Sequence, residues 1–351
     1  MQVQAAEDTY VKTDELTDND TAAPKKDSVI PSKNQYEYQK QELAAFCHFG
    51  MNTYTGSEWG NGKENPNQFQ LTNDFDEETY VKAIHDAGFK KLIITAKHHD
   101  GFCIWPSEMT THDTETAGYE ATFRRTSRAC TKYNIDMGLY LSPWDVNSEY
   151  YGYKDKDGKK LVGADGQPLN GKTWDQVKQE DALDYNEYYD NQLKEILGND
   201  KYGNNGHFKE VWMDGAKDTN DKSNAQDYDF QRWFKTIQQY EGKASGKYED
   251  DCLLFGAESY TTVRWIGNER GYAAEETWQS QQSTERIIRS IVTVETDIRK
   301  DFRMEISGLC RRRIQRLRQA GSGEKARKRL FRWSSLQVFI SDRLDTTLHC
   351  Y

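Results

Sequence analysis

The sequence predicts an α/β protein, a (β/α)8 TIM-like barrel that is incomplete at its C-terminal end. Apolar, strand-like segments alternate with helix-like segments between residues 34 and 278, and this alternation is typical of a parallel sheet. The predicted strands end in polar or aromatic residues, and barrel enzymes carry their active sites at the C-terminal ends of their strands. A chain of 351 residues is long enough for such a domain.

Six segments are predicted to be strands because each is an apolar run between turn-forming or charged residues. They are residues 44–52, 90–99, 137–144, 208–214, 252–258 and 263–267. The predicted helices lie between them, and Gly88 and Gly198 are stop signals for two of these helices. The helices are residues 76–88, a stretch that ends at Asn134, 184–198 and 227–242. Residues 151–177 contain the turn sequences KDG and ADG, so we expect a long loop or a hairpin there.

Composition divides the chain into a leader (1–33), a catalytic barrel (34–278) and a basic tail (279–351). The leader is acidic and Thr-rich, with few bulky apolar residues. Its Val3-Gln4-Ala5 segment resembles the end of a signal peptide, which predicts a secreted, extracellular or cell-surface protein. A plain disordered leader explains the same residues.

The tail differs from the rest of the chain in its basic residues. Residues 1–278 contain 25 Lys and 6 Arg, whereas residues 279–351 contain 3 Lys and 13 Arg, with no Asn and no Pro. We interpret the tail as sequence read in a shifted frame, which would not fold natively; a basic arm for nucleic acid or a membrane surface is the alternative. A smaller cluster, Arg124, Arg125 and Arg128, is either a second local shift or a solvated helix face.

Charge and composition narrow the classes of partner. The net charge of −10 argues against general binding to nucleic acid or to an anionic membrane. No apolar stretch is long enough to span a bilayer, and the six cysteines form no CxxC pair that would indicate a zinc framework. The 9 Trp and 21 Tyr suit sugar ligands, although core packing uses the same residues.

Two carboxylates are predicted at the mouth of the barrel. Asp214 ends the apolar strand of EVWMDGAKD, and Glu269 follows Trp265 in VRWIGNERGYA. Glycoside hydrolysis uses such a pair, because one carboxylate attacks or stabilises the anomeric carbon while the other protonates the leaving oxygen. Spacing alone leaves open that Asp214 only caps the next turn.

Five motifs resemble those of family 29 glycoside hydrolases, the retaining α-L-fucosidases. They are FCHFGMNTYTGSEWG, KHHDGFCIWPSEMTTHD, GLYLSPWDVN, VWMDGA and VRWIGNERGYAAEETW, in the family's order over residues 36–278. In particular, the chain is similar to the bacterial branch that acts on α-1,3/1,4-linked fucose. The resemblance implies release of fucose by double displacement from a fucosylated oligosaccharide or glycoprotein glycan, with no cofactor and no metal.

The resemblance also implies roles for individual residues. Asp214 would be the nucleophile and Glu269 the general acid/base, with Glu258 as the alternative acid/base. The implied sugar-binding residues are His48, Glu58, Trp59, His98, His99 and Trp265.

His98 and His99 are neighbours in the chain, and adjacent strand residues point to opposite faces. We therefore expect one of them to reach the site through a turn at the strand end, or to orient its neighbour. A metal site at His98-His99-Asp100 is a weaker alternative, because no third ligand follows at a useful spacing.

The family's pattern continues after the ETW motif into further barrel strands that we do not find in residues 279–351. A barrel without its last strands exposes sheet edges and part of its core. We therefore expect poor folding and weak activity. A non-catalytic fucose-binding protein derived from the same fold is the alternative function.

Overall fold

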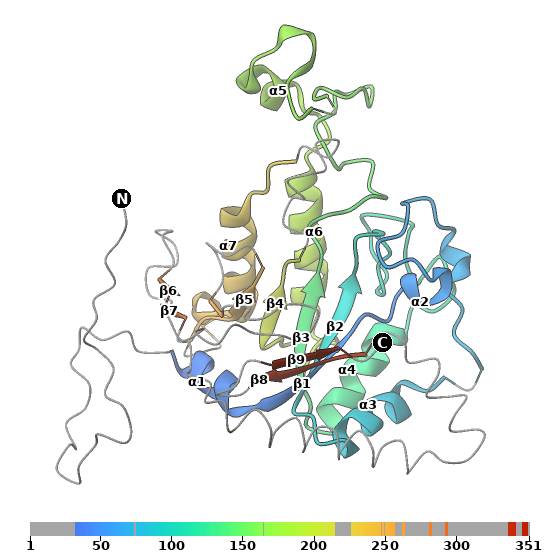
Figure 1. Ribbon diagram of the computed structural model, residues 1–351, viewed down its shortest axis with the longest axis vertical. Helices are drawn as coiled ribbons and strands as arrows, with labels where there is room; N and C mark the ends of the chain where they lie inside the picture. The colour runs from blue at the N-terminus through green and yellow to red at the C-terminus, as the bar shows by residue number, and fades with distance from the viewer. Residues whose placement is uncertain are drawn as a thin grey trace, which may run out of the picture.

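The structure is a computed structural model of the chain (Figure 1). It describes residues 32–73, 75–163, 165–214, 226–246, 248, 250–256 and 262–263, and the backbone of four short strands at 281–282, 292–293, 336–341 and 346–349. The predictions for nearly all of the leader, and for Glu258, Trp265 and Glu269, lie outside these residues.

A parallel sheet forms the centre of the molecule (Figure 1). Each strand pairs in parallel with the strand that precedes it in the chain, which is the order of the first strands of a (β/α) barrel. The strands are β1 (Glu42–Cys47), β2 (Lys91–Lys97), β3 (Asp136–Leu141), β4 (Glu210–Trp212) and β5 (Leu253–Phe255). The predicted parallel α/β fold is thus confirmed. Its incompleteness stays a prediction, because most of the chain after residue 263 lies outside the described ranges.

Two strands from the tail extend this sheet beyond β1. The strand β8 (Leu336–Ser341) pairs antiparallel with β1, and β9 (Thr346–His349) pairs antiparallel with β8. We expected the incomplete barrel to expose sheet edges. At the β1 edge the N–H and C=O groups instead pair with β8, whose sequence LQVFIS is rich in strand-forming residues. A separate ladder joins β6 (Gln281–Gln282) to β7 (Val292–Thr293). That the tail does not fold natively stays a prediction, since the structure describes only these strands of it.

The four predicted connecting helices are present. Asp76, Asp184 and Asp229 cap three of them, because each carboxylate accepts a hydrogen bond from a backbone N–H of the first turn. The helices are α3 (Glu77–Asp86), α4 (Thr122–Lys132), α6 (Tyr185–Leu197) and α7 (Phe230–Glu241). On α4 the arginines 124, 125 and 128 are all exposed while Phe123 is buried, which supports the solvated helix face.

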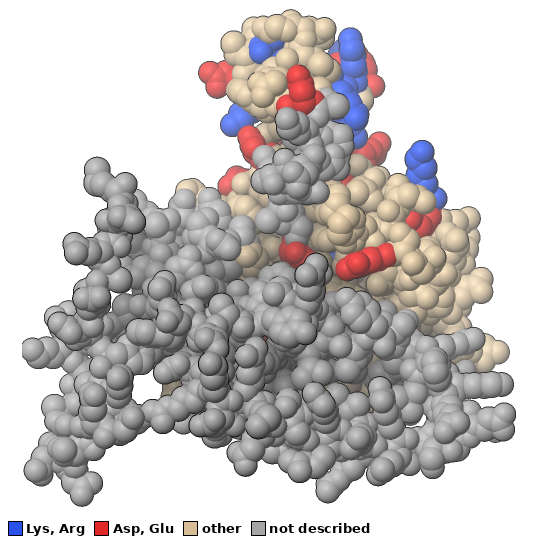
Figure 2. Space-filling view, in the orientation of Figure 1, with Lys and Arg blue, Asp and Glu red and all other residues tan. Residues whose placement is uncertain are grey.

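Three further α-helices within the described residues are not predicted from the sequence. Ser32 and Gln35 form a capping box that starts α1 (Lys33–Lys40), and α2 (Asn52–Thr55) is a single turn after β1. The third, α5 (Trp174–Glu180), belongs to the excursion 151–180, which stands away from the sheet in Figure 1. Antiparallel bridges within the excursion confirm its predicted hairpin character, and in Figure 2 charges of both signs are interspersed on its visible face.

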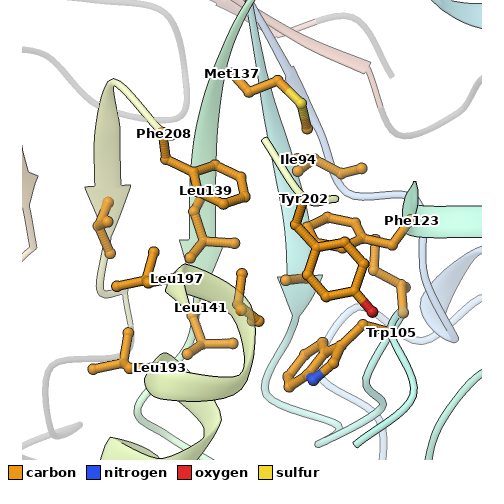
Figure 3. Packing of buried hydrophobic residues seen from close by; sticks show 14 of the residues in the cluster. Ile94, Trp105, Phe123, Met137, Leu139, Leu141, Leu193, Leu197, Tyr202 and Phe208 are labelled. Atoms are coloured by element: carbon orange, nitrogen blue, oxygen red, sulfur yellow. The ribbon is translucent and has the colours of Figure 1, made fainter. Parts of the chain in front are cut away.

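Side chains alternate between the two faces of the sheet. Leu139 and Leu141 of β3 point toward the helices and pack near Leu193 and Leu197 of α6 (Figure 3). The opposite face carries a separate cluster that includes Ala44, Phe46, Ile93, Tyr140, Trp212, Leu253 and Phe255. In a barrel this second face is the interior, and the functional side chains continue from it. None of the described helices combines the length and apolar character needed to cross a membrane.

Candidate active site

The side chains that follow β1, β2, β3 and β4 meet at the C-terminal edge of the sheet. His48 comes directly after β1, His98 and His99 after β2, and Asp214 two residues after β4. The C-terminal ends of parallel strands lie at one edge, so these four predicted site residues gather there. The structure therefore brings these four predicted site residues to one edge of the sheet.

Tyr140 connects the carboxylate of Asp214 to the histidines. Its hydroxyl donates a hydrogen bond of 2.9 Å to Asp214 Oδ2, and its ring lies 5.0 Å from His48 and 5.6 Å from His98, centroid to centroid. Burial, together with the charge of Asp214, raises the pKa of Tyr140 well above its ordinary value, so the phenol stays protonated as a donor. Tyr140 is a site residue that the sequence analysis missed. Its pairing opposite Trp212 on β4 is seen only in the structure, so no local signal in the sequence indicated it.

The two adjacent histidines both face the site because β2 ends before them. The N–H of Gly101 donates to His98 O at 3.0 Å and closes a turn over His98–Gly101, and Gly101 adopts φ +78°, which a glycine tolerates. The His98 ring then lies 4.8 Å from that of His48, and the His99 ring 4.8 Å from that of Trp144. The predicted turn at the strand end is confirmed.

His98 and His99 are held in the neutral form. Burial lowers the pKa of His98 well below its ordinary range, and the charge of His99 adds to that effect. Burial, with the charges of His48 and Lys97, lowers the pKa of His99 to about 3. A neutral imidazole offers one N–H donor and one nitrogen acceptor, which suits the hydroxyl groups of an uncharged sugar.

Hydrogen bonds from the strands orient the histidine rings. Thr95 Oγ1 lies 2.7 Å from His48 Nδ1, and Ser142 Oγ lies 2.7 Å from His99 Nδ1. Because Ser142 donates its single proton to Trp144 O at 2.9 Å, the network assigns the His99 proton to Nδ1 and leaves Nε2 as an acceptor. The Nδ1 of His98 is buried and has no hydrogen-bond partner among the described residues, as expected of a group that meets a ligand.

Two tryptophans form an apolar wall beside His99. Trp59 is 53% exposed, and its ring lies 5.6 Å from that of Trp144 and 6.4 Å from that of His99. Aromatic faces of this kind pack against the C–H faces of sugars. Glu58 precedes Trp59 and is exposed. Trp144 is a second residue that the sequence analysis did not assign to the site.

The described residues show no group of three His, Cys, Asp or Glu side chains that could hold a metal ion. In the sequence His98-His99-Asp100, the Asp100 carboxylate accepts the N–H of Phe102 at 2.8 Å and closes the turn. The arrangement suits a neutral ligand with several hydroxyls and one apolar face, next to a carboxylate in a fixed position.

Known proteins are similar to this chain in sequence and in fold. The family model for α-L-fucosidases matches residues 9–297, a range that extends past both compositional boundaries, at 34 and 278. Alpha-L-fucosidase 1 of Arabidopsis thaliana is 37% identical over 253 residues, which cover 71% of this chain and 41% of the plant protein.

The comparison with solved structures also finds α-L-fucosidases. A GH29 fucosidase from Ruminococcus gnavus in complex with fucose is 55% identical with a TM-score of 0.66, over 80% of this chain and 53% of that chain. An Asp-to-Ala variant of it, also in complex with fucose, matches with a TM-score of 0.65 and 55% identity, over 75% of this chain and 50% of that one. The chain thus spans about half the length of these solved relatives and less of the plant protein.

Proposed function

Because the chain belongs to the α-L-fucosidase family of glycoside hydrolases, we propose that it releases α-L-fucose from glycans as a retaining exo-glycosidase. The observation that carries the proposal is the Asp214 carboxylate, held at 2.9 Å by the hydroxyl of Tyr140, whose ring packs against those of His48 and His98. A relative that is 55% identical was solved in complex with fucose, which supports the same ligand class.

In the proposed mechanism Asp214 attacks the anomeric carbon of fucose. The glycosidic C–O bond breaks as Glu269 gives its proton to the leaving oxygen, and a covalent fucosyl-enzyme forms. Water then attacks the anomeric carbon while Glu269 takes its proton, so fucose leaves with its original configuration. The Tyr140 hydroxyl holds the attacking carboxylate in one orientation, which lowers the entropic cost of reaching the transition state.

Neutral histidines and the aromatic wall provide the proposed sugar contacts. His48, His98 and His99 would exchange hydrogen bonds with the fucose hydroxyls. Glu58 and Trp59 would complete the sugar pocket, with the Trp59 ring against an apolar face of the sugar and Trp265 close to it. Fucose is uncharged, so histidines that stay neutral avoid the cost of a buried charge without a counterion.

The test is turnover of an aryl α-L-fucoside by the whole chain and its variants. We expect Asp214→Asn to lose roughly a thousandfold or more in kcat, since it removes the nucleophile. Glu269→Gln should slow glycans more than the aryl substrate, whose leaving group needs no proton, whereas Glu258→Gln should stay close to the parent. A parent-like Asp214→Asn, or a loss confined to Glu258→Gln, contradicts these roles. His85→Gln, exposed on α3, is the control.

The same substrates distinguish a fucosidase from the alternative, a protein that binds fucose without cleaving fucosides. Calorimetric binding of L-fucose without turnover of any fucoside would favour a non-catalytic fucose-binding protein, which would require Asp214 or Glu269 to be mispositioned although the sequence retains both.

We also propose a preference for α-1,3/1,4-linked fucose, which the motifs support. We expect faster release of fucose from a Lewis-type trisaccharide than from an α-1,2-linked trisaccharide, and the reverse order contradicts this preference.

We further propose that the protein is secreted, on the composition of residues 1–33. Immunoblots of medium, envelope and cell contents in the native host test it, and recovery in the cell contents alone contradicts it.

The shifted-frame origin of the tail remains our proposal, supported by its 13 Arg and 3 Lys. Hydrogen exchange tests the consequence of this origin, which is that the tail has no native fold. Amides of residues 279–351 should exchange within seconds, as in an unfolded chain. Slow exchange over 336–349, where β8 and β9 are placed, would contradict the idea that this tail has no native fold.

A further inference from the structure

A buried ion pair lies directly behind the histidines. Lys97 ends β2 and is fully buried, and its Nζ donates to Asp145 Oδ2 and to Gln192 Oε1, both at 2.9 Å. Tyr185 OH is a third acceptor at 3.4 Å. All three protons of the ammonium group therefore have acceptors, as a buried charge requires.

An irregularity in β2 directs Lys97 away from the site. The register between β2 and β3 shifts between Thr95 and Lys97, so the alternation that places Thr95 beside His48 does not continue. Lys97 instead reaches α6, where the rings of Tyr185, Tyr188 and Tyr189 lie 5.3–5.7 Å from Nζ. A strand irregularity next to a site commonly re-aims a side chain in this way.

Asp145 belongs to the loop after β3 that carries Trp144. Its Oδ1 accepts the N–H groups of Asn147 at 3.0 Å and Ser148 at 2.8 Å, while Oδ2 accepts from Lys97. The N–H of Val146 donates to His99 O at 2.9 Å. The ion pair therefore joins the loop after β3 to the turn after β2.

We propose that the Lys97–Asp145 pair positions His99 and Trp144 for the sugar, by fixing the His98–Gly101 turn against the Ser142–Ser148 loop. Neither residue of the pair touches the sugar in this proposal. The inference rests on the proposed function for the identity of the ligand, and on the contacts above for the link itself. Misplacing a binding group by about 1 Å can cost up to roughly a hundredfold in rate.

The charge of Lys97 has a second effect on His99. It is one of the charges that lower the pKa of His99, after burial and the charge of His48. Losing it should let His99 take up a proton at higher pH. The double variant described below also neutralises Asp145, which is not among the charges that shift the pKa of His99. The other titratable groups around His99 are unchanged in it; they are His48, His98, Asp100 and Asp214.

The chain offers a matched control pair. Lys91 and Glu210 form a second ion pair, with side chains 1% and 0% exposed, and Glu210 Oε1 accepts the indole N–H of Trp212 at 3.1 Å. Glu210 lies four residues before Asp214, roughly 13 Å along an extended strand. Removing its charges disturbs a buried pair without touching the His98–Gly101 turn.

The experiment compares Lys97→Met/Asp145→Asn with Lys91→Met/Glu210→Gln in the full chain. The amide oxygens of Asn and Gln still accept the N–H groups held by Asp145 and Glu210. Each double variant therefore removes the ionic link and the hydrogen bonds that its lysine donates, which for Lys97 include those to Gln192 and Tyr185. We expect the first variant to raise KM for an aryl α-L-fucoside about tenfold with little change in kcat, while the control stays within about twofold. Equal changes in KM for variants with equal loss of thermal stability would overturn the proposal.

A measurement that needs no substrate tests the positioning role of the ion pair independently of the proposed fucosidase activity. In ¹³C-labelled histidine NMR spectra, assigned with His99→Gln, the His99 resonance should move and titrate at higher pH in the first variant only. If the parent chain does not act on fucosides, the proposed function fails while this measurement still tests the link. An unmoved His99 resonance overturns the positioning role. Lys97→Met alone takes the place of the double variant if that protein does not melt cooperatively, because it removes the Lys97 charge while Asp145 still accepts the N–H groups of Asn147 and Ser148.

Discussion

The turn after β2 gives a quantitative prediction through two glycines with similar backbones. Gly101 has φ +78° and Gly118 has φ +83°. A Cβ at position 101 would lie 2.5 Å from Asp145 Oδ1 and 2.7 Å from Asn147 Cβ, whereas a Cβ at position 118 meets nothing within 4 Å. The two alanine variants therefore share the same backbone strain and differ in a steric clash with the buried ion pair.

The expected costs follow from these contacts. Gly118→Ala should lower the free energy of unfolding by about 1–2 kcal/mol, the cost of an alanine in the left-handed region. Gly101→Ala adds the displacement of Asp145 from Lys97, and breaking a buried pair costs about 3–5 kcal/mol. The two terms together give about 4–7 kcal/mol, and we expect partial relaxation of the loop to lower this total to about 3–5 kcal/mol. Urea unfolding followed by circular dichroism measures both variants. Costs that agree within about 0.5 kcal/mol would refute the packing of Asp145 against Gly101.

Three other predictions concern protonation and chemistry. Burial holds the pKa of His98 and His99 below 6.5, so the unfolded chain binds more protons and the free energy of unfolding should fall as pH drops below about 6.5, by up to about 1.4 kcal/mol per pH unit for each histidine. Urea titrations at pH 7 and pH 5 should show a smaller loss for His99→Gln than for the parent, and equal losses contradict this. Asp214→Gly with azide should yield β-fucosyl azide from an aryl α-fucoside, detected by NMR; the α-azide would instead identify Asp214 as the acid/base. Burial raises the pKa of the Cys47 thiol to about 11, so iodoacetamide at pH 7.5 should modify Cys47 in urea but not in the folded chain, as mass spectrometry of its peptide would show.

Local pattern was sufficient to predict the parallel sheet, the connecting helices and the residues at the strand ends. Apolar runs ended by polar residues placed His48, His98 and Asp214 correctly, because strand ends of a parallel sheet share one edge. Strand bounds were less accurate: the predicted strand 90–99 ends at Lys97. The turn that follows places both histidines in the site.

Tyr140 and the Lys97–Asp145 pair could not be predicted from local pattern. The inward direction of Tyr140 depends on its register with β4, and the outward direction of Lys97 depends on the irregularity of β2. Both are consequences of pairing between strands far apart in the sequence. The helix α5 was missed because its capping box at Thr173 lies within a segment rich in turn signals.

The stereochemistry of the first product tests the account most directly. Hydrolysis of an aryl α-L-fucoside by the full chain would be followed by proton NMR in the first minutes, before the anomers of free fucose equilibrate. The account predicts that α-L-fucose appears first and that β-L-fucose follows only by mutarotation. Initial formation of β-L-fucose, or no fucose at all from a chain that is folded by circular dichroism, would contradict it.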